Sequence, residues 1–143
     1  VFLHADTELP GGAEEAIREA LTTRSWGRFD VAIESRHPLL ALVARTMNAR
    51  SRLSGIATGD QAIFVRREAF GGFPEIELME DVAFSLEMAR RGARPACLAL
   101  RAKTSARRWE SRGVLRTIVL MWRLRLMYRL GARPERLARL YGR

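Results

Sequence analysis

The chain has 143 residues, of which 48% are apolar, and it carries a net charge of +9. This length fits one domain with a hydrophobic core, and the apolar content excludes a disordered chain. The charge is concentrated at one end: residues 101–143 hold 13 Arg and Lys against 2 Asp and Glu, whereas residues 1–100 hold 12 against 14. Such an asymmetry predicts contact with a polyanion, a phosphate or an anionic membrane surface.

Strand-like and helix-like apolar spacings alternate along the chain, which is typical of the α/β class. Strands are expected at residues 1–5, 26–35, 61–66 and 95–100, and helices at residues 13–23, 38–53, 80–91, 111–130 and 134–140. No Pro- or Ser-rich linker divides the chain, so we expect one domain. The lone Cys97 excludes a disulfide framework and a cysteine-rich zinc site, and it favours a reducing, cytoplasmic location.

The first candidate for chemistry is the segment His4-Ala5-Asp6, at the end of the first expected strand. Acidic groups at the carboxyl end of a strand face the crevice where α/β proteins bind ligands. Asp6, with His4 two residues before it, could hold a divalent cation that neutralises a diphosphate. The alternative is that Asp6 only caps a turn before Pro10.

The second candidate is the pair Glu80-Asp81, which opens the helix expected at residues 80–91. A carboxylate within reach of a hydroxyl group can accept its proton and so act as a general base. The alternative is structural, because two acidic residues at this position also cap a helix and complement its dipole.

Two further segments carry suitable residue types. Gly59-Asp60-Gln61 precedes an expected strand, and its glycine permits either close approach of the backbone to a ligand or an ordinary tight turn. Arg108-Trp109 places a guanidinium beside an aromatic ring, a combination that can bind phosphate or stack on a sugar. The alternative for this pair is a solvated basic segment with a core tryptophan.

In this order, the four segments resemble the family 2 glycosyltransferases, which have the GT-A fold, a Rossmann-like mixed sheet flanked by helices. Members carry an Asp-x-Asp motif, which reads His-Ala-Asp at residues 4–6 here, and a Glu-Asp pair, here at residues 80–81. Many also carry Gln-x-x-Arg-Trp, of which Arg-Trp remains at residues 108–109 while Ser105 replaces the glutamine. The residues within these motifs are also similar to those of a bacterial subgroup found with radical-SAM or arsenosugar gene clusters.

The resemblance implies an inverting, non-processive transfer of a sugar from a nucleotide-diphosphate donor to a hydroxyl group of a small-molecule or lipid-linked acceptor. Asp6 and His4 would bind the divalent cation, Mn²⁺ or Mg²⁺. Asp81 would be the catalytic base and Glu80 would orient the acceptor. The residues implied in substrate binding are Gly59, Asp60, Gln61, Arg108 and Trp109.

The resemblance also implies a division of the chain. Residues 1–110 would be the catalytic and acceptor-binding half, and residues 111–143 a basic amphipathic helical tail. Because residue 1 falls close to the Asp-x-Asp position, we expect the chain to represent the C-terminal part of a GT-A domain, truncated at its N-terminal side. The strands that grip the nucleotide would then precede it.

Two other functions compete with this one. A nucleic-acid partner is not expected, because aromatic residues are sparse in the basic tail and no recognised binding motif is present. The helix at 111–130 has an unbroken apolar run of only Ile118–Trp122, too short to span a membrane. It is either a buried helix whose arginines snorkel, or a surface helix that docks on the anionic inner face of a membrane. In the second case, the chain could be a non-catalytic anion-binding module.

Overall fold

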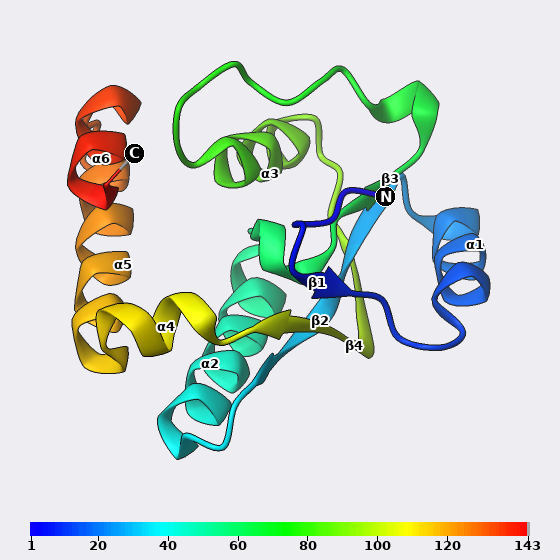
Figure 1. The fold of residues 1–143 in the computed structure, drawn as a ribbon. Coiled ribbons are helices and arrows are strands. Elements are labelled where there is room, and N and C mark those ends of the chain that lie inside the picture. Colours follow the sequence, from blue (N-terminus) through cyan, green and yellow to red (C-terminus); the bar gives the residue numbers. More distant parts are fainter. Residues whose placement is uncertain (143) are drawn as a thin grey trace.

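The computed structural model describes residues 1–142, apart from the side chain of Arg108. Its centre is a curled mixed sheet of four strands in the order β1-β4-β2-β3 (Figure 1). The long strands β2 (Trp26–Glu34) and β4 (Ala96–Ser105) are parallel neighbours, while β1 (Thr7–Glu8) and β3 (Phe64–Val65) pair antiparallel at the two edges. The α/β class expected from the sequence is confirmed.

Six α-helices surround this sheet. They are α1 (Ala13–Thr23), α2 (Pro38–Ser54), α3 (Glu80–Arg90), α4 (Arg107–Arg112), α5 (Val114–Arg129) and α6 (Pro134–Tyr141). Two short 3-10 helices, η1 (Gly59–Gln61) and η2 (Arg67–Ala69), flank β3. Figure 1 shows α1 and α2 on different sides of β2, with α5 and α6 side by side at the edge of the molecule.

The hydrophobic core has a separate cluster for each covering helix. Helix α1 packs on Phe29 and Phe64 of the sheet, and α2 packs on Val31. Helix α3 packs on Trp26, which is fully buried and meets Phe84 edge to face. A fourth cluster joins the residues before α3 to α5 and α6. The α5–α6 pair is therefore attached to the domain beside the start of α3.

Most expected elements form, and the differences have physical reasons. The prediction of a strand at residues 1–5 was wrong. In this segment only Phe2 makes a bridge, to Ile63, and regular strand pairing begins at Thr7, where β4 is the partner. The helix expected at 111–130 is divided, because Gly113 has φ 84° and ψ 126° and separates α4 from α5. The strand expected at 95–100 continues to Ser105, because it pairs with β2 along its length.

None of the helices between residues 1 and 142 is both long enough and apolar enough to cross a membrane.

Candidate functional site

Three segments distant in sequence meet around Asp81, in the first turn of α3. The backbone N–H of Gly59, in η1, donates a hydrogen bond of 2.7 Å to Oδ2 of Asp81. The N–H of Val82 donates a second one of 2.7 Å to Oδ1. The imidazole of His4 lies against Gly59, because a Cβ built on this glycine would be 2.0 Å from Nε2 of the ring. The absence of a side chain at Gly59 therefore makes room for His4.

Asp60 completes the cluster on the other side of the imidazole. Nδ1 of His4 lies 3.4 Å from Oδ1 of Asp60, and both side chains are partly exposed. The hydrogen bond with Asp60 raises the pKa of His4, and the charges of Asp60, Asp81 and Asp6 act in the same direction against the lowering effect of burial. Asp6, itself exposed, therefore lies close enough for its charge to act on His4.

The electrostatic environment of Asp81 differs from that of an ordinary surface aspartate. Burial raises the pKa of Asp81, and the nearby charges of Glu80 and Asp60 raise it further, while the hydrogen bonds from Gly59 and Val82 oppose the shift. A carboxylate with a raised pKa is a stronger base than an exposed one. The same position in the first helical turn would otherwise serve only as a cap, so burial and the neighbouring charges distinguish this site.

Backbone strain is present at both segments that carry the cluster. Ala62, directly after η1, has φ 47°, and Met79, directly before α3, has φ 71°. These are the only residues other than glycine with positive φ among those described. Such conformations cost on the order of 1–3 kcal/mol each and gather at functional sites, where the surrounding structure enforces them. The strain supports the choice of this region as the functional site.

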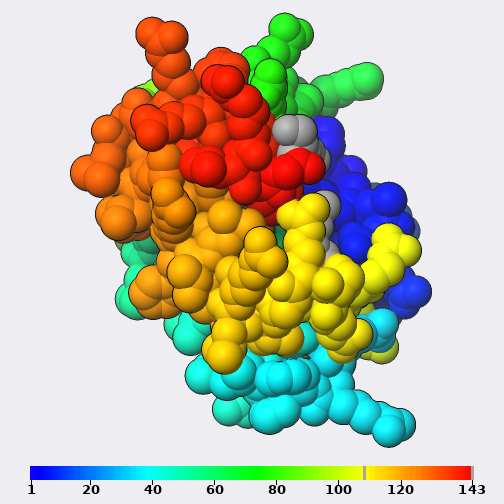
Figure 2. Space-filling model, turned by 60° about the vertical axis from the view of Figure 1, so that its left-hand side comes forward, coloured from blue at the N-terminus to red at the C-terminus, as the bar shows by residue number. Residues whose placement is uncertain are grey.

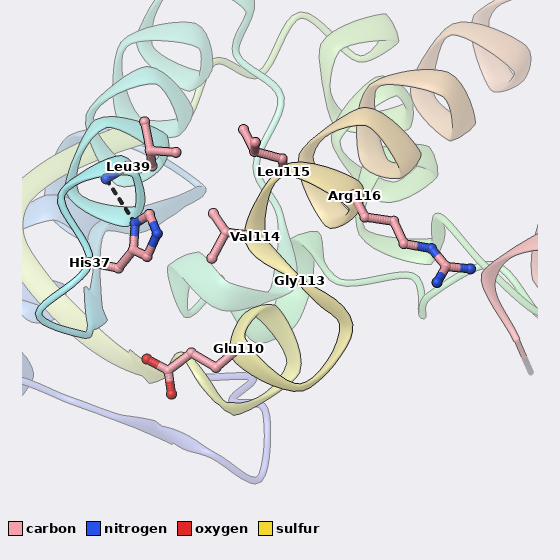
Figure 3. Close-up of a pocket in the computed structure, with 7 residues that line it drawn as sticks. All are labelled: His37, Leu39, Glu110, Gly113, Val114, Leu115 and Arg116. Atoms are coloured by element: carbon pink, nitrogen blue, oxygen red, sulfur yellow. Dashed lines mark hydrogen bonds between the residues drawn. The ribbon is translucent and has the colours of Figure 1, made fainter.

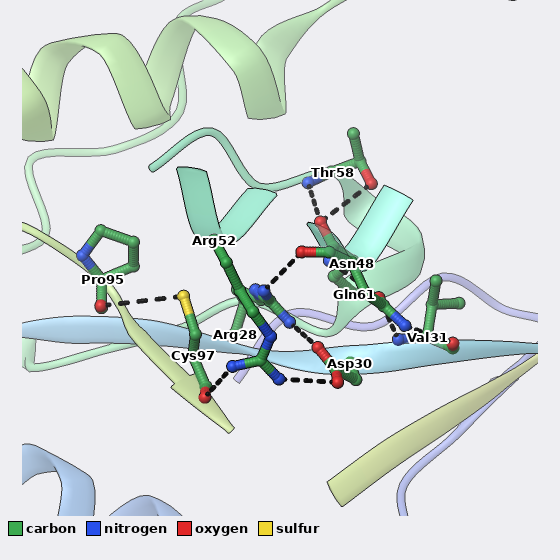
Figure 4. Close-up of polar contacts among 9 residues, drawn as sticks. All are labelled: Arg28, Asp30, Val31, Asn48, Arg52, Thr58, Gln61, Pro95 and Cys97. Atoms are coloured by element: carbon green, nitrogen blue, oxygen red, sulfur yellow. Dashed lines mark hydrogen bonds and ion pairs between the residues drawn. The ribbon is translucent and has the colours of Figure 1, made fainter. Parts of the chain in front are cut away.

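A polar network connects η1 to α2 and β2 (Figure 4). The amide of Gln61 is fully buried; its oxygen accepts from the N–H of Thr58 at 3.2 Å and its nitrogen donates to Asn48 at 3.4 Å. Asn48 exchanges hydrogen bonds of 2.9 and 3.0 Å with the backbone of Val31 in β2. Gln61, expected to bind substrate, thus connects η1 to α2 and the sheet and positions Gly59.

The remaining predicted residues lie at different distances from the cluster. Glu80 precedes Asp81 and its charge acts on it. Trp109 is half-buried in α4, and among the described residues it makes no hydrogen bond to the cluster. The side chain of Arg108 falls outside the described part of the chain.

The charge of Asp81 also acts on two arginines that the sequence did not single out. Arg50, in the last turns of α2, has its pKa lowered to about 10, chiefly by burial and then by the charge of Arg125. Burial likewise lowers the pKa of Arg125 in α5. The charge of Asp81 opposes both shifts, so all three groups share one neighbourhood. Both arginines stand in sequences rich in arginine, where no local pattern marks them.

A metal ion would find few protein ligands here. Within residues 1–142, no three His, Cys, Asp or Glu side chains gather in an arrangement that could hold one. The His4–Asp60 pair brings two possible donors together, and Asp6 is close enough for its charge to act on His4. Magnesium-type sites that bind phosphates often use only one or two carboxylates and take their other ligands from phosphate and water. The donor set fits a cation of that kind.

A surface pocket lies apart from the cluster, between the start of α2 and the junction of α4 and α5 (Figure 3). His37 contributes to its wall, and its Nδ1 accepts a hydrogen bond of 3.3 Å from the N–H of Leu39, which caps α2. None of the predicted site residues lines this pocket.

Comparisons with protein-family models, with curated proteins and with solved structures found no match for this chain. Fold and site together define an α/β protein with a histidine–carboxylate cluster around a buried, strained helix start.

Proposed function

We propose that this chain contributes the acceptor-side half of a GT-A glycosyltransferase site, with Asp81 as the general base. The observation that carries the proposal is the environment of Asp81, a half-buried carboxylate of raised pKa that accepts a hydrogen bond from Gly59, the residue against which His4 lies. Asp81 would accept the proton of the acceptor hydroxyl group while the oxygen of that hydroxyl group forms a bond to the anomeric carbon of the donor. The nucleoside diphosphate would leave from the opposite face of the sugar.

The other residues of the cluster have supporting roles in this proposal. Asp6 and His4 would hold a divalent cation, Mn²⁺ or Mg²⁺, whose other ligands would be phosphate and water, and the cation would supply positive charge to the leaving diphosphate. Gly59 keeps Asp81 oriented through its N–H, and its lack of a side chain leaves room for the imidazole. Glu80 would orient the acceptor.

The proposal is tested by the release of nucleoside diphosphate from UDP-, GDP- and dTDP-sugars in the presence of candidate acceptors. We expect Asp81→Asn to lower turnover by roughly 10²–10⁴-fold, because the amide keeps the shape but cannot take the proton. Glu87→Gln is the matched control, since Glu87 lies on the same helix and pairs with Arg91 at the surface. Near-normal turnover of Asp81→Asn would leave Asp81 as a helix cap and refute the proposal.

A second candidate function is supported by the outer face of α5. Five large apolar side chains on this face are each more than half exposed, and they recur every three or four residues: Leu115, Val119, Trp122, Leu126 and Leu130. Exposed arginines at 116, 123 and 129 lie on the same helix. Figure 2 shows α5 and α6 together at the molecular surface. An apolar stripe with flanking cations is the pattern of a helix that lies on an anionic membrane.

Membrane docking is tested by sedimentation with lipid vesicles. We expect the chain to bind vesicles that contain phosphatidylglycerol and to bind pure phosphatidylcholine vesicles much less. The double variant Trp122→Ser with Leu126→Ser should abolish this binding. Because both side chains are exposed, these changes should leave the fold intact, whereas serine at buried positions would unfold the chain. Equal binding of the double variant would show that charge alone is responsible. Docking is compatible with glycosyl transfer, because it would bring a lipid-linked acceptor to the site.

A further inference from the structure

Arg50 is half-buried, and two of its three guanidinium nitrogens lie inside the protein without a partner. Its Nε and Nη2 atoms are shielded from solvent and make no hydrogen bond within the described residues. An unsatisfied buried donor costs about 1–3 kcal/mol, and more when it is charged. Native proteins leave very few such groups, so each one that remains points to a ligand or to a functional reason.

The carboxylates of the cluster do not fill this role. No ion pair within the described residues involves Arg50 or Arg125; the pairs present use other arginines, His4 and Lys103. Asp81 attracts both guanidinium groups, but no hydrogen bond or ion pair within the described residues joins its carboxylate to either of them. One carboxylate also leaves the two arginines with an excess of positive charge.

Other positive charges also act on these two guanidinium groups. Arg125 lowers the pKa of Arg50, and Arg129 lowers the pKa of both. They come from different elements, α2 and α5, so the fold itself holds like charges together beside Asp81. Such an arrangement is unfavourable alone and becomes favourable when an anion lies between the groups. Arginine suits phosphoryl oxygens best, because its planar fork of donors binds them in pairs.

We propose that Arg50 and Arg125 form a site that binds a phosphoryl group beside Asp81. The inference rests on the proposed function for the origin of that group, which is either the diphosphate of the donor or a phosphate on the acceptor. In both cases the arginines would bind phosphoryl oxygens directly, in addition to any cation held at Asp6 and His4. Arg50 contributes the shielded donors and Arg125 the second positive charge.

The test is calorimetric titration of the chain with inorganic pyrophosphate and with inorganic phosphate, in excess chelator so that no metal-dependent contact contributes. We expect Arg50→Met and Arg125→Met each to weaken binding by roughly 10–100-fold, the effect of losing charge-assisted hydrogen bonds. Arg45→Met on α2 and Arg123→Met on α5 are matched controls, because both side chains are exposed. These control variants should bind as the wild type does.

The outcomes separate the alternatives. Tighter binding of pyrophosphate would assign the site to the donor, and tighter binding of phosphate would assign it to a phosphorylated acceptor. Equal weakening by the control variants, or no binding to the wild type, would overturn the proposal in favour of general attraction to a basic surface. Thermal unfolding provides a further check: if Arg50 were only structural, Arg50→Met would destabilise the chain, whereas removal of an unpaired buried charge should not.

This test is independent of sugar transfer. Loss of pyrophosphate binding in Arg50→Met together with no turnover of any nucleotide sugar would support the anion site and contradict the glycosyltransferase proposal. Turnover that depends on Asp81 but is unchanged in Arg50→Met and Arg125→Met would support the glycosyltransferase proposal and contradict the anion site.

Discussion

The buried ion pair of β2 allows a quantitative prediction. Arg28 is fully buried, and its guanidinium pairs with Asp30 and donates a hydrogen bond of 3.2 Å to the backbone oxygen of Asn48 (Figure 4). Asp30 is 13% exposed and also binds Arg52 at 2.7 Å. Asp30→Asn would keep the shape of this residue but remove the only carboxylate that pairs with Arg28 within the described residues.

The expected loss is about 3–5 kcal/mol of unfolding free energy, because it leaves a buried charge without its partner. Glu34→Gln, on the same strand, is the matched control. Glu34 pairs with Lys103 at 3.9 Å with side chains 61% and 60% exposed, so solvent screens the pair. Removal of such a pair costs under about 1 kcal/mol. The two changes remove the same charge from one strand and differ in burial.

Urea denaturation followed by circular dichroism measures both variants. Domains of this kind are stable by only about 5–15 kcal/mol, so a loss of this size is a large fraction of the stability and easy to measure. The double variant Arg28→Met with Asp30→Asn should recover much of the loss, since an apolar side chain replaces the unpaired cation. A loss below about 1 kcal/mol in Asp30→Asn would show that water reaches Arg28, and the reasoning would fail.

Three further predictions concern the site and the sheet. Gly59→Ala should displace His4 and lower its pKa, measured by NMR; Gly11→Ala, with no heavy atom near its Cβ, should not. Since burial raises the pKa of Asp81 above the ordinary aspartate value of about 4, turnover should begin to fall on acidification at a pH above that value. The free energy of unfolding should decrease as the pH rises from the ordinary aspartate pKa through the raised pKa of native Asp81, because the native state keeps the proton to a higher pH than the unfolded state does. A pH-independent profile would contradict this. Gly27→Ala should cost about 1–3 kcal/mol in urea denaturation, because its Cβ would lie 2.5 Å from the backbone oxygen of Ala96; an unchanged midpoint would contradict the tight strand contact.

The helices show how far local sequence determines this fold. Helix α1 begins and ends where the sequence predicts, and α2 extends only one residue beyond the prediction. The ends of α2 are marked by Pro38, which opens the helix, and by Gly55, which has φ 71° and closes it. These signals act within one or two turns, so they can be read without knowledge of the rest of the chain. Strand lengths could not be read in this way. The extent of β4 depends on β2, which lies 70 residues earlier in the chain.

For the site, the sequence by itself determined which residues carry usable chemistry: a histidine near an aspartate, a Gly-Asp pair and two carboxylates at a helix start. The tertiary structure decided which of them meet. It placed His4 against Gly59, whose N–H binds Asp81, and it buried Gln61 in the scaffold. It also brought Arg50 and Arg125 together, which no pattern predicted. The reason is physical: burial and the interaction of charges depend on distances between residues far apart in sequence, and only the packing of α2, α3 and α5 fixes those distances.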